Sequence, residues 1–151
     1  MKFFSFQFGK VGLASIFVIV ATFSGAHAST VLVTEQEAAL PPATQSGGTR
    51  GILRGPRIEL DDIDKDELQS PVRLKIRFQA FGDTTIDLRS LQVIYLKMPA
   101  VDLTSRVMPF AQPTGIDMPD AELPPGEHKI SIEISDSDGH IANRIIALHI
   151  R

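Results

Sequence analysis

The densest group of possible metal ligands in the sequence is an acidic run that follows residue 60. Asp62, Asp64 and Asp66 alternate with other residues, as at the start of a calcium-binding loop. In such a loop the sixth position is a glycine and the twelfth is a glutamate, but here these positions hold Glu67 and Arg73. We therefore expect a solvated loop opposite the basic face of the next strand, with a low-affinity cation site as the alternative.

Three histidines follow the first 28 residues, and two of them lie in the last pair of predicted strands. His149 could approach His128 across a hairpin, but two imidazoles supply only half of a tetrahedral metal site, so we do not expect one. Asp136 and Asp138 flank the turn between these strands. Calcium binding is one interpretation of this pair, and we favour turn formation, because aspartate carboxylates accept hydrogen bonds from nearby backbone N–H groups.

Signatures of common enzymes are missing from the sequence. It has no Gly-x-Ser-x-Gly elbow, no His-Glu-x-x-His pair and no glycine-rich phosphate loop. A Ser-His-Asp site could still be assembled by the fold, since such a triad is defined by geometry and not by sequence order. Because the strand pattern explains each of the three histidines, we expect a protein that is not an enzyme and needs no cofactor.

The N-terminus has the pattern of a cleaved export signal over residues 1–28. Lys2 and Lys10 precede an apolar run over residues 11–23, which is too short to span a bilayer core of about 30 Å. Two cleavage sites fit the small-x-small rule: one leaves Ser29 as the first residue, and the other leaves His27. We favour the first, and we expect a periplasmic or secreted protein with no membrane span after cleavage.

Composition narrows the possible functions further. The chain has no cysteine, which excludes disulfides, iron–sulfur clusters and thiolate metal sites. Removal of the signal takes away two lysines, so 13 basic residues face 18 acidic ones and the net charge falls from −3 to −5. An acidic product of this kind argues against nucleic-acid binding.

Residues 29–55 are predicted to be a flexible leader. They contain Pro41-Pro42 and a small polar stretch over residues 43–49, without a sustained apolar period. Thr34 and Glu37 match a helix capping box, but Pro41 follows so soon that any helix must be short.

From residue 56 onward the pattern is that of short strands. Residues 56–60 fit an edge strand that begins at a proline, and residues 72–79 alternate between an apolar and a basic face. Residues 91–98 are largely apolar on both faces, as in a central strand. The prolines of residues 99–125 leave no room for a helix of normal length.

The C-terminal hairpin is the clearest element. Residues 129–135 alternate, the turn contains Gly139, and the last strand puts Ala142, Ile146, Leu148 and Ile150 on one side. About seven strands over residues 56–151 predict a single all-β domain, an immunoglobulin-like β-sandwich.

A partner-binding surface is predicted in the proline-rich segment over residues 99–119. Its apolar side chains exceed what a solvated loop needs, and they are Val107, Met108, Phe110, Ile116 and Met118. The alternative is that most of them cover the open side of the sandwich.

A family resemblance is carried by the end of the chain. Leu123-Pro124-Pro125-Gly126-Glu127-His128, the alternation up to Asp136 and then Gly139 resemble the last strands of bacterial immunoglobulin-like domains. The resemblance covers residues 56–151 and implies binding or scaffolding. It also implies that His128 takes the place of a packed aromatic residue, with a ring nitrogen bonded to the backbone.

The chain also resembles CopC-like periplasmic copper-binding proteins. Asp138-Gly139-His140 matches their last hairpin, and the resemblance implies copper binding by Asp138, His140 and an N-terminal His27. The chain lacks the tryptophan of that family, and some 28 residues separate His27 from the first predicted strand.

These observations favour an exported, non-catalytic module that binds or scaffolds another envelope or extracellular protein. A periplasmic protein that binds copper or calcium is the first alternative. An inhibitor of an exported hydrolase is the second.

Overall fold

The computed structural model describes residues 29–44, 55–61 and 67–151. This part of the chain is mostly β, and none of its helices is long and apolar enough to cross a membrane. Its elements are β1 (Thr30–Val31), α1 (Glu35–Ala38), β2 (Arg57–Leu60), β3 (Val72–Gln79), β4 (Ile86–Tyr95), β5 (Val101–Asp102), α2 (Thr104–Val107), the 3-10 turn η1 (Met108–Phe110), β6 (Ala111–Gln112), β7 (Gly115–Glu122), β8 (Gly126–Asp136) and β9 (Ile141–Ile150). The predicted signal and the aspartates at 62, 64 and 66 lie outside the described residues.

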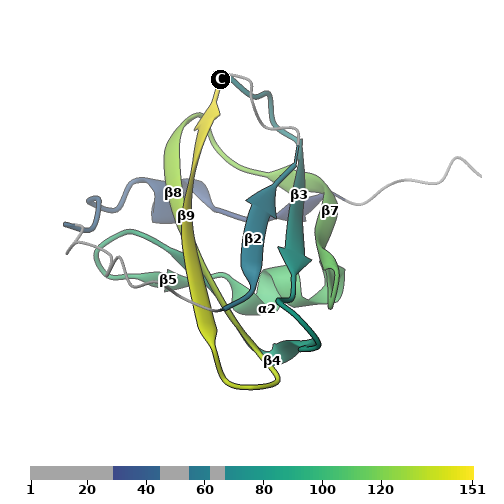
Figure 1. The fold of residues 1–151 in the computed structure, drawn as a ribbon. Coiled ribbons are helices and arrows are strands. Elements are labelled where there is room, and N and C mark those ends of the chain that lie inside the picture. Colours follow the sequence, from purple (N-terminus) through teal and green to yellow (C-terminus); the bar gives the residue numbers. More distant parts are fainter. Residues whose placement is uncertain (1–28, 45–54, 62–66) are drawn as a thin grey trace, which may run out of the picture.

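The strands form two sheets (Figure 1). The first sheet has the order β1-β7-β3-β2, and β6 also pairs with β7. The second sheet has the order β5-β4-β8-β9. The described part of the chain has nine strands, where about seven were predicted. β1, β5 and β6 have only two residues each and are too short for a period-two pattern.

The two sheets enclose one apolar core. In β3 the side chains of Val72, Leu74, Ile76 and Phe78 are all buried, as the alternation predicts. Every second residue of β8 and most even-numbered residues of β9 supply the facing layer. Each such side chain stabilises the fold by about 1.5–3 kcal/mol relative to leaving it in water.

The C-terminal hairpin is confirmed, with continuous pairing between β8 and β9. Its turn is held by Asp136, whose buried carboxylate accepts hydrogen bonds from the backbone N–H groups of Asp138 at 3.0 Å and His140 at 2.9 Å. Gly139 has a φ of 82°, in the region that glycine adopts without strain.

The prediction of a flexible leader is wrong for residues 29–44, which pack against the two sheets. We name these residues the strap. Strand β1 pairs with β7 in parallel, and Leu32 and Val33 enter the core with 0% and 2% of their surface exposed. The predicted capping box is present: the Thr34 N–H donates to the Glu37 carboxylate at 2.9 Å, and the Glu37 N–H donates to the Thr34 hydroxyl at 3.3 Å.

The strap joins the two sheets on one side of the molecule. It begins on β7 of the first sheet and ends beside the second, where Ala43 N–H donates to the Leu96 carbonyl at 3.1 Å. Figure 1 shows it in purple, passing behind β8 and β9 from the side of β7 toward that of β5. The strap is therefore part of the folded body.

Candidate functional site

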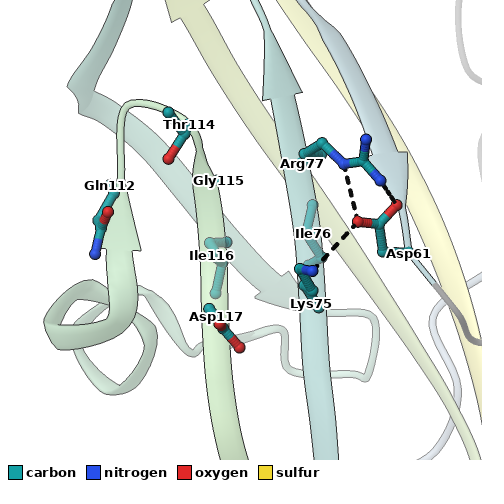
Figure 2. Close-up of a pocket in the computed structure, with 9 residues that line it drawn as sticks. All are labelled: Asp61, Lys75, Ile76, Arg77, Gln112, Thr114, Gly115, Ile116 and Asp117. Carbon is teal, nitrogen blue, oxygen red and sulfur yellow. Dashed lines mark hydrogen bonds and ion pairs between the residues drawn. The ribbon is translucent and has the colours of Figure 1, made fainter.

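A shallow groove lies on the outward face of the first sheet. It has a volume of about 450 Å³ and is lined by Asp61, Lys75, Ile76, Arg77, Gln112, Thr114, Gly115, Ile116 and Asp117 (Figure 2). β3 supplies Lys75 and Arg77, whose side chains point outward because the alternate residues of the strand fill the core. β7 supplies Asp117, and the turn before it supplies Thr114.

Ion pairs neutralise most of the charge of this groove. The Arg77 guanidinium donates to both carboxylate oxygens of Asp61, and Lys75 Nζ lies 3.8 Å from the same carboxylate (Figure 2). Next to the groove, Arg73 donates two hydrogen bonds of 2.9 and 2.8 Å to Asp117, which lower the pKa of that carboxyl. The described start of the acidic run thus lies opposite the basic face, as predicted.

The chemistry available in the groove is recognition of polar groups. Its only hydroxyl is that of Thr114, and no described lining residue is a histidine or a cysteine that could act beside it as a base or nucleophile. Exposed pairs such as these contribute little stability, because water screens them.

His128 occupies the core position that the resemblance implies. Its Nε2 donates to the Pro124 carbonyl at 2.7 Å, so in the neutral ring Nδ1 accepts from the Tyr95 hydroxyl at 2.9 Å. Burial lowers the pKa of His128, which keeps the imidazole neutral. The ring packs and bonds backbone, as expected.

His149 does not approach His128. The register pairs His128 with Leu148 and His149 with Glu127, so the two imidazoles lie on opposite faces of the sheet. His128 is buried, whereas His149 is exposed. A metal site between them is excluded in this register.

The structure describes two of the three copper ligands that the CopC-like resemblance implies, Asp138 and His140. His140 Nδ1 lies 3.1 Å from a carboxylate oxygen of Asp136. Burial acts to raise the pKa of Asp136, but its hydrogen bonds from His140 and Asp138 outweigh burial and lower it. His27 lies outside the described residues, and among those that are described no three His, Cys, Asp or Glu side chains could hold a metal ion.

The predicted surface over residues 99–119 is mostly core. Val107, Ile116 and Met118 are fully buried between the sheets, so they cannot contact a partner. Only Met108, with 39% of its surface exposed, and the half-buried Phe110 reach solvent. The apolar count of the segment was correct, but it did not reveal which side each residue faces.

The outer edge of β9 is the feature that the sequence analysis missed. On the side away from β8, the His149 carbonyl accepts from Leu68 N–H and Arg151 N–H donates to the Leu68 carbonyl, both at 2.8 Å. Backbone groups of alternate residues point the same way, so those of Asn143, Ile145 and Ala147 also point outward. None of the described residues bonds these groups. We name residues 143–147 the β9 window.

The window has neighbours at both ends and also along its side, where β2 contacts β9 and the Ile58 carbonyl accepts a hydrogen bond of 2.6 Å from Arg144. Leu68 covers the C-terminal end through its bridge to Ile150. At the other end, a Cβ on Gly55 would lie only 2.9 Å from the carbonyl oxygen of Ile141, so the chain passes closely there.

The side chains of β9 do not protect its edge. The outward positions hold Ile141, Asn143, Ile145, Ala147 and His149, and none of them is a lysine, arginine, aspartate or glutamate. Ile141 and Ile145 leave 50% and 44% of their surfaces exposed. Natural edge strands usually carry lysine, proline or a bulge that discourages pairing with other chains. One pattern in the sequence indicates an exposed apolar side chain on this strand. Ile145 and Ile146 are adjacent, so one of them must face outward.

Comparison of this chain with protein-family models, curated proteins and solved structures gives no match.

Proposed function

We propose that this protein is an exported, non-catalytic module of immunoglobulin-like type that binds another envelope or extracellular protein. The β9 window carries the proposal. Its backbone groups at Asn143, Ile145 and Ala147 have no partner among the described residues, and Ile141 and Ile145 on the outer face expose apolar surface that a partner could cover. Export rests on the signal pattern of residues 1–28.

The positions of the histidines support a role without catalysis. His128 is fixed in the core by Tyr95 and Pro124, and His140 is held by Asp136. His149 is exposed on the face of the second sheet, opposite Glu127. None of them lies beside a serine or threonine hydroxyl within hydrogen-bond distance among the described residues, as an activated nucleophile requires.

The two-sheet body supports the immunoglobulin-like class. Three features support this class: the proline-glycine corner before β8, the central strand β4 and the closing hairpin. Fold alone does not define a function, so the proposal depends on the edge.

The test is site-specific photo-cross-linking in the cells that produce the protein. A benzophenone amino acid replaces Asn143 in the window, and the matched control replaces Gln79, which is exposed on β3 of the other sheet. We expect a discrete protein adduct from position 143 and none from position 79. Absence of an adduct at 143, or the same adducts at both positions, would overturn the proposal.

A further inference from the structure

We propose that removal of the predicted signal creates an ion pair between the new N-terminal ammonium of Ser29 and the Glu122 carboxylate, which stabilises the docking of the strap on β7. The inference rests on the export that the proposed function includes, and not on the β9 window. Three observations carry it: the position of Ser29, the carboxylates at the start of the strap, and the chemistry of the cleaved bond.

The predicted cleavage site lies directly before the strap. Residues 26–28 fit the small-x-small rule, and cleavage after them leaves Ser29 as the first residue. Strand β1 begins at the next residue and pairs with β7 in parallel, with Val31 opposite Glu122. The first residue of the cleaved chain therefore lies beside β7.

The side chain of Ser29 contacts Glu122. The Ser29 hydroxyl donates a hydrogen bond to a carboxylate oxygen of Glu122. In any serine the backbone nitrogen lies about 3–4 Å from its own Oγ. A small rotation of the Glu122 side chain is therefore enough to bring its carboxylate to the Ser29 nitrogen.

The start of the strap lies among carboxylates. A groove of about 410 Å³ at this place is lined by Glu35 and Glu122 and by no lysine, arginine or histidine. Asp120 shares a face of β7 with Glu122, since alternate residues of a strand point the same way. No described basic residue forms an ion pair with any of the three, and Arg73 on the adjacent β3 is paired with Asp117. A positive charge at the start of the strap would thus be attracted by all three carboxylates.

Cleavage of the signal supplies this positive charge. In the uncleaved chain the Ser29 nitrogen belongs to the neutral peptide bond with Ala28. Hydrolysis by an export peptidase breaks that bond and consumes one water. Ala28 takes the oxygen of the water and becomes a carboxylate, and the Ser29 nitrogen becomes an ammonium. An α-ammonium has an ordinary pKa of about 7.7–8.0, so it is charged at pH 7.

The ion pair would act on the least covered part of the strap. Leu32 and Val33 are buried, whereas Val31 leaves 46% of its surface exposed. Terminal residues fray unless they are tied to the rest of the domain. The ammonium at Ser29 would hold this end, so the strap of the cleaved chain is docked more firmly than that of the uncleaved chain.

The test begins with the exported protein and identification of its first residue by mass spectrometry. We expect Ser29. Half of the sample is then acetylated near pH 7, where the α-amine reacts and lysines, with a pKa near 10.4, stay protonated. Acetylation restores a neutral amide at Ser29, as in the uncleaved chain. At low salt the unmodified protein should melt about 2–4 °C above the acetylated one. His27 as the first residue, or equal melting temperatures, would overturn the inference.

Glu122→Gln separates the ion pair from other effects of acetylation. The glutamine amide can still accept the hydrogen bond of the Ser29 hydroxyl, but it has no charge. This variant should lose most of the difference between the unmodified and acetylated chains. Glu133→Gln is the matched control and should keep the difference, because Glu133 is also half-buried but lies on β8 of the other sheet. An unchanged difference in Glu122→Gln would sink the inference.

The pH dependence gives a second readout. An ammonium that is paired in the folded state has its pKa raised above the unfolded value of about 7.7–8.0. Its contribution to stability is complete below that range and is lost as the pH rises through the folded pKa. The difference between the unmodified and acetylated chains should therefore hold near pH 7 and vanish above about pH 9. The charged groups that face the nitrogen are the carboxylates of Glu35, Asp120 and Glu122, and carboxylates titrate far below this range. A difference that persists at about pH 10 would contradict the ion pair.

The two proposals fail in different ways. An exported chain that begins at another residue, together with a specific adduct at position 143, would remove this inference and leave the proposed function. The expected effects at Ser29 without an adduct would remove the proposed partner and leave the ion pair. A chain that is not exported would remove both.

Discussion

β7 and β9 are long strands of the two sheets, and their outer edges differ in backbone pairing. β7 is paired on its outer side by β6 near its start and by β1 near its end. β9 has Leu68 at its C-terminal end and β2 beside it, but residues 143–147 have no backbone partner among the described residues on that side. The N-terminal residues thus supply backbone partners to the edge of β7, whereas the edge of β9 meets β2 through side chains and keeps unpaired backbone groups.

Among truncations of a side chain, the largest effect is expected at the covered edge of β7. Leu32→Ala should lower the free energy of unfolding by about 2–5 kcal/mol, because it removes a fully buried side chain of the strap and leaves a cavity. Urea denaturation measures the change. Val31→Ala is the control, since its neighbouring side chain is 46% exposed and should matter little. Equal effects of the two changes would mean that the strap is not docked.

The next effect concerns the ion pair that holds the strap. Arg106 donates hydrogen bonds of 2.7 and 2.8 Å to Glu37 and a third to the Leu32 carbonyl at 2.8 Å. The hydrogen bonds from Arg106 are the main cause that lowers the pKa of Glu37 to about 2. Arg106→Gln should cost about 1–3 kcal/mol of stability at pH 7, since it leaves a half-buried carboxylate without its cation.

The pH dependence of that cost gives an independent check. A carboxyl whose pKa is lowered in the folded state contributes its full stability above its unfolded pKa near 4.5, and loses it as the pH falls toward about 2. The difference in unfolding free energy between the original protein and Arg106→Gln should therefore shrink over this range. Arg89→Gln, which breaks an exposed pair with Asp87, is the control and should show a much smaller change.

The smallest effect on stability is expected in the β9 window. Ile145→Lys should change the free energy of unfolding by no more than about 0.5 kcal/mol, because the side chain is already half in water. Ile146→Lys, one residue away, should unfold the protein, since Ile146 is 3% exposed and a lysine there would bury a charge. Thermal melts of both variants test this contrast. A large loss in Ile145→Lys would show that the edge is covered in the isolated protein.

The strands and the C-terminal hairpin could be predicted from the sequence because their signals are local. The alternation of β3, β8 and β9 and the turn at Gly139 are contained within a few residues. The same is true of the capping box at Thr34. These elements would form the same pattern in almost any sheet.

The strap and the window depend on distant residues and were not predictable in this way. Glu37 pairs with Arg106, which follows 69 positions later. The sequence of the strap does not indicate this partner. Ile145 and Ile146 have identical side chains, but they point to opposite faces of the second sheet, and only the face of Ile146 is covered by the first sheet. The same reason explains Val107, Ile116 and Met118, which face inward.

The buried pair of Tyr95 and His128 also makes the protein its own optical reporter. The whole chain has one tyrosine and no tryptophan, so its near-ultraviolet fluorescence comes from a single phenol. That phenol is fully buried and donates a 2.9 Å hydrogen bond to the imidazole that is tied to the Pro124 carbonyl. Unfolding of the proline-glycine corner before β8 would change the emission of Tyr95. Unfolding can therefore be followed by tyrosine fluorescence without an added dye.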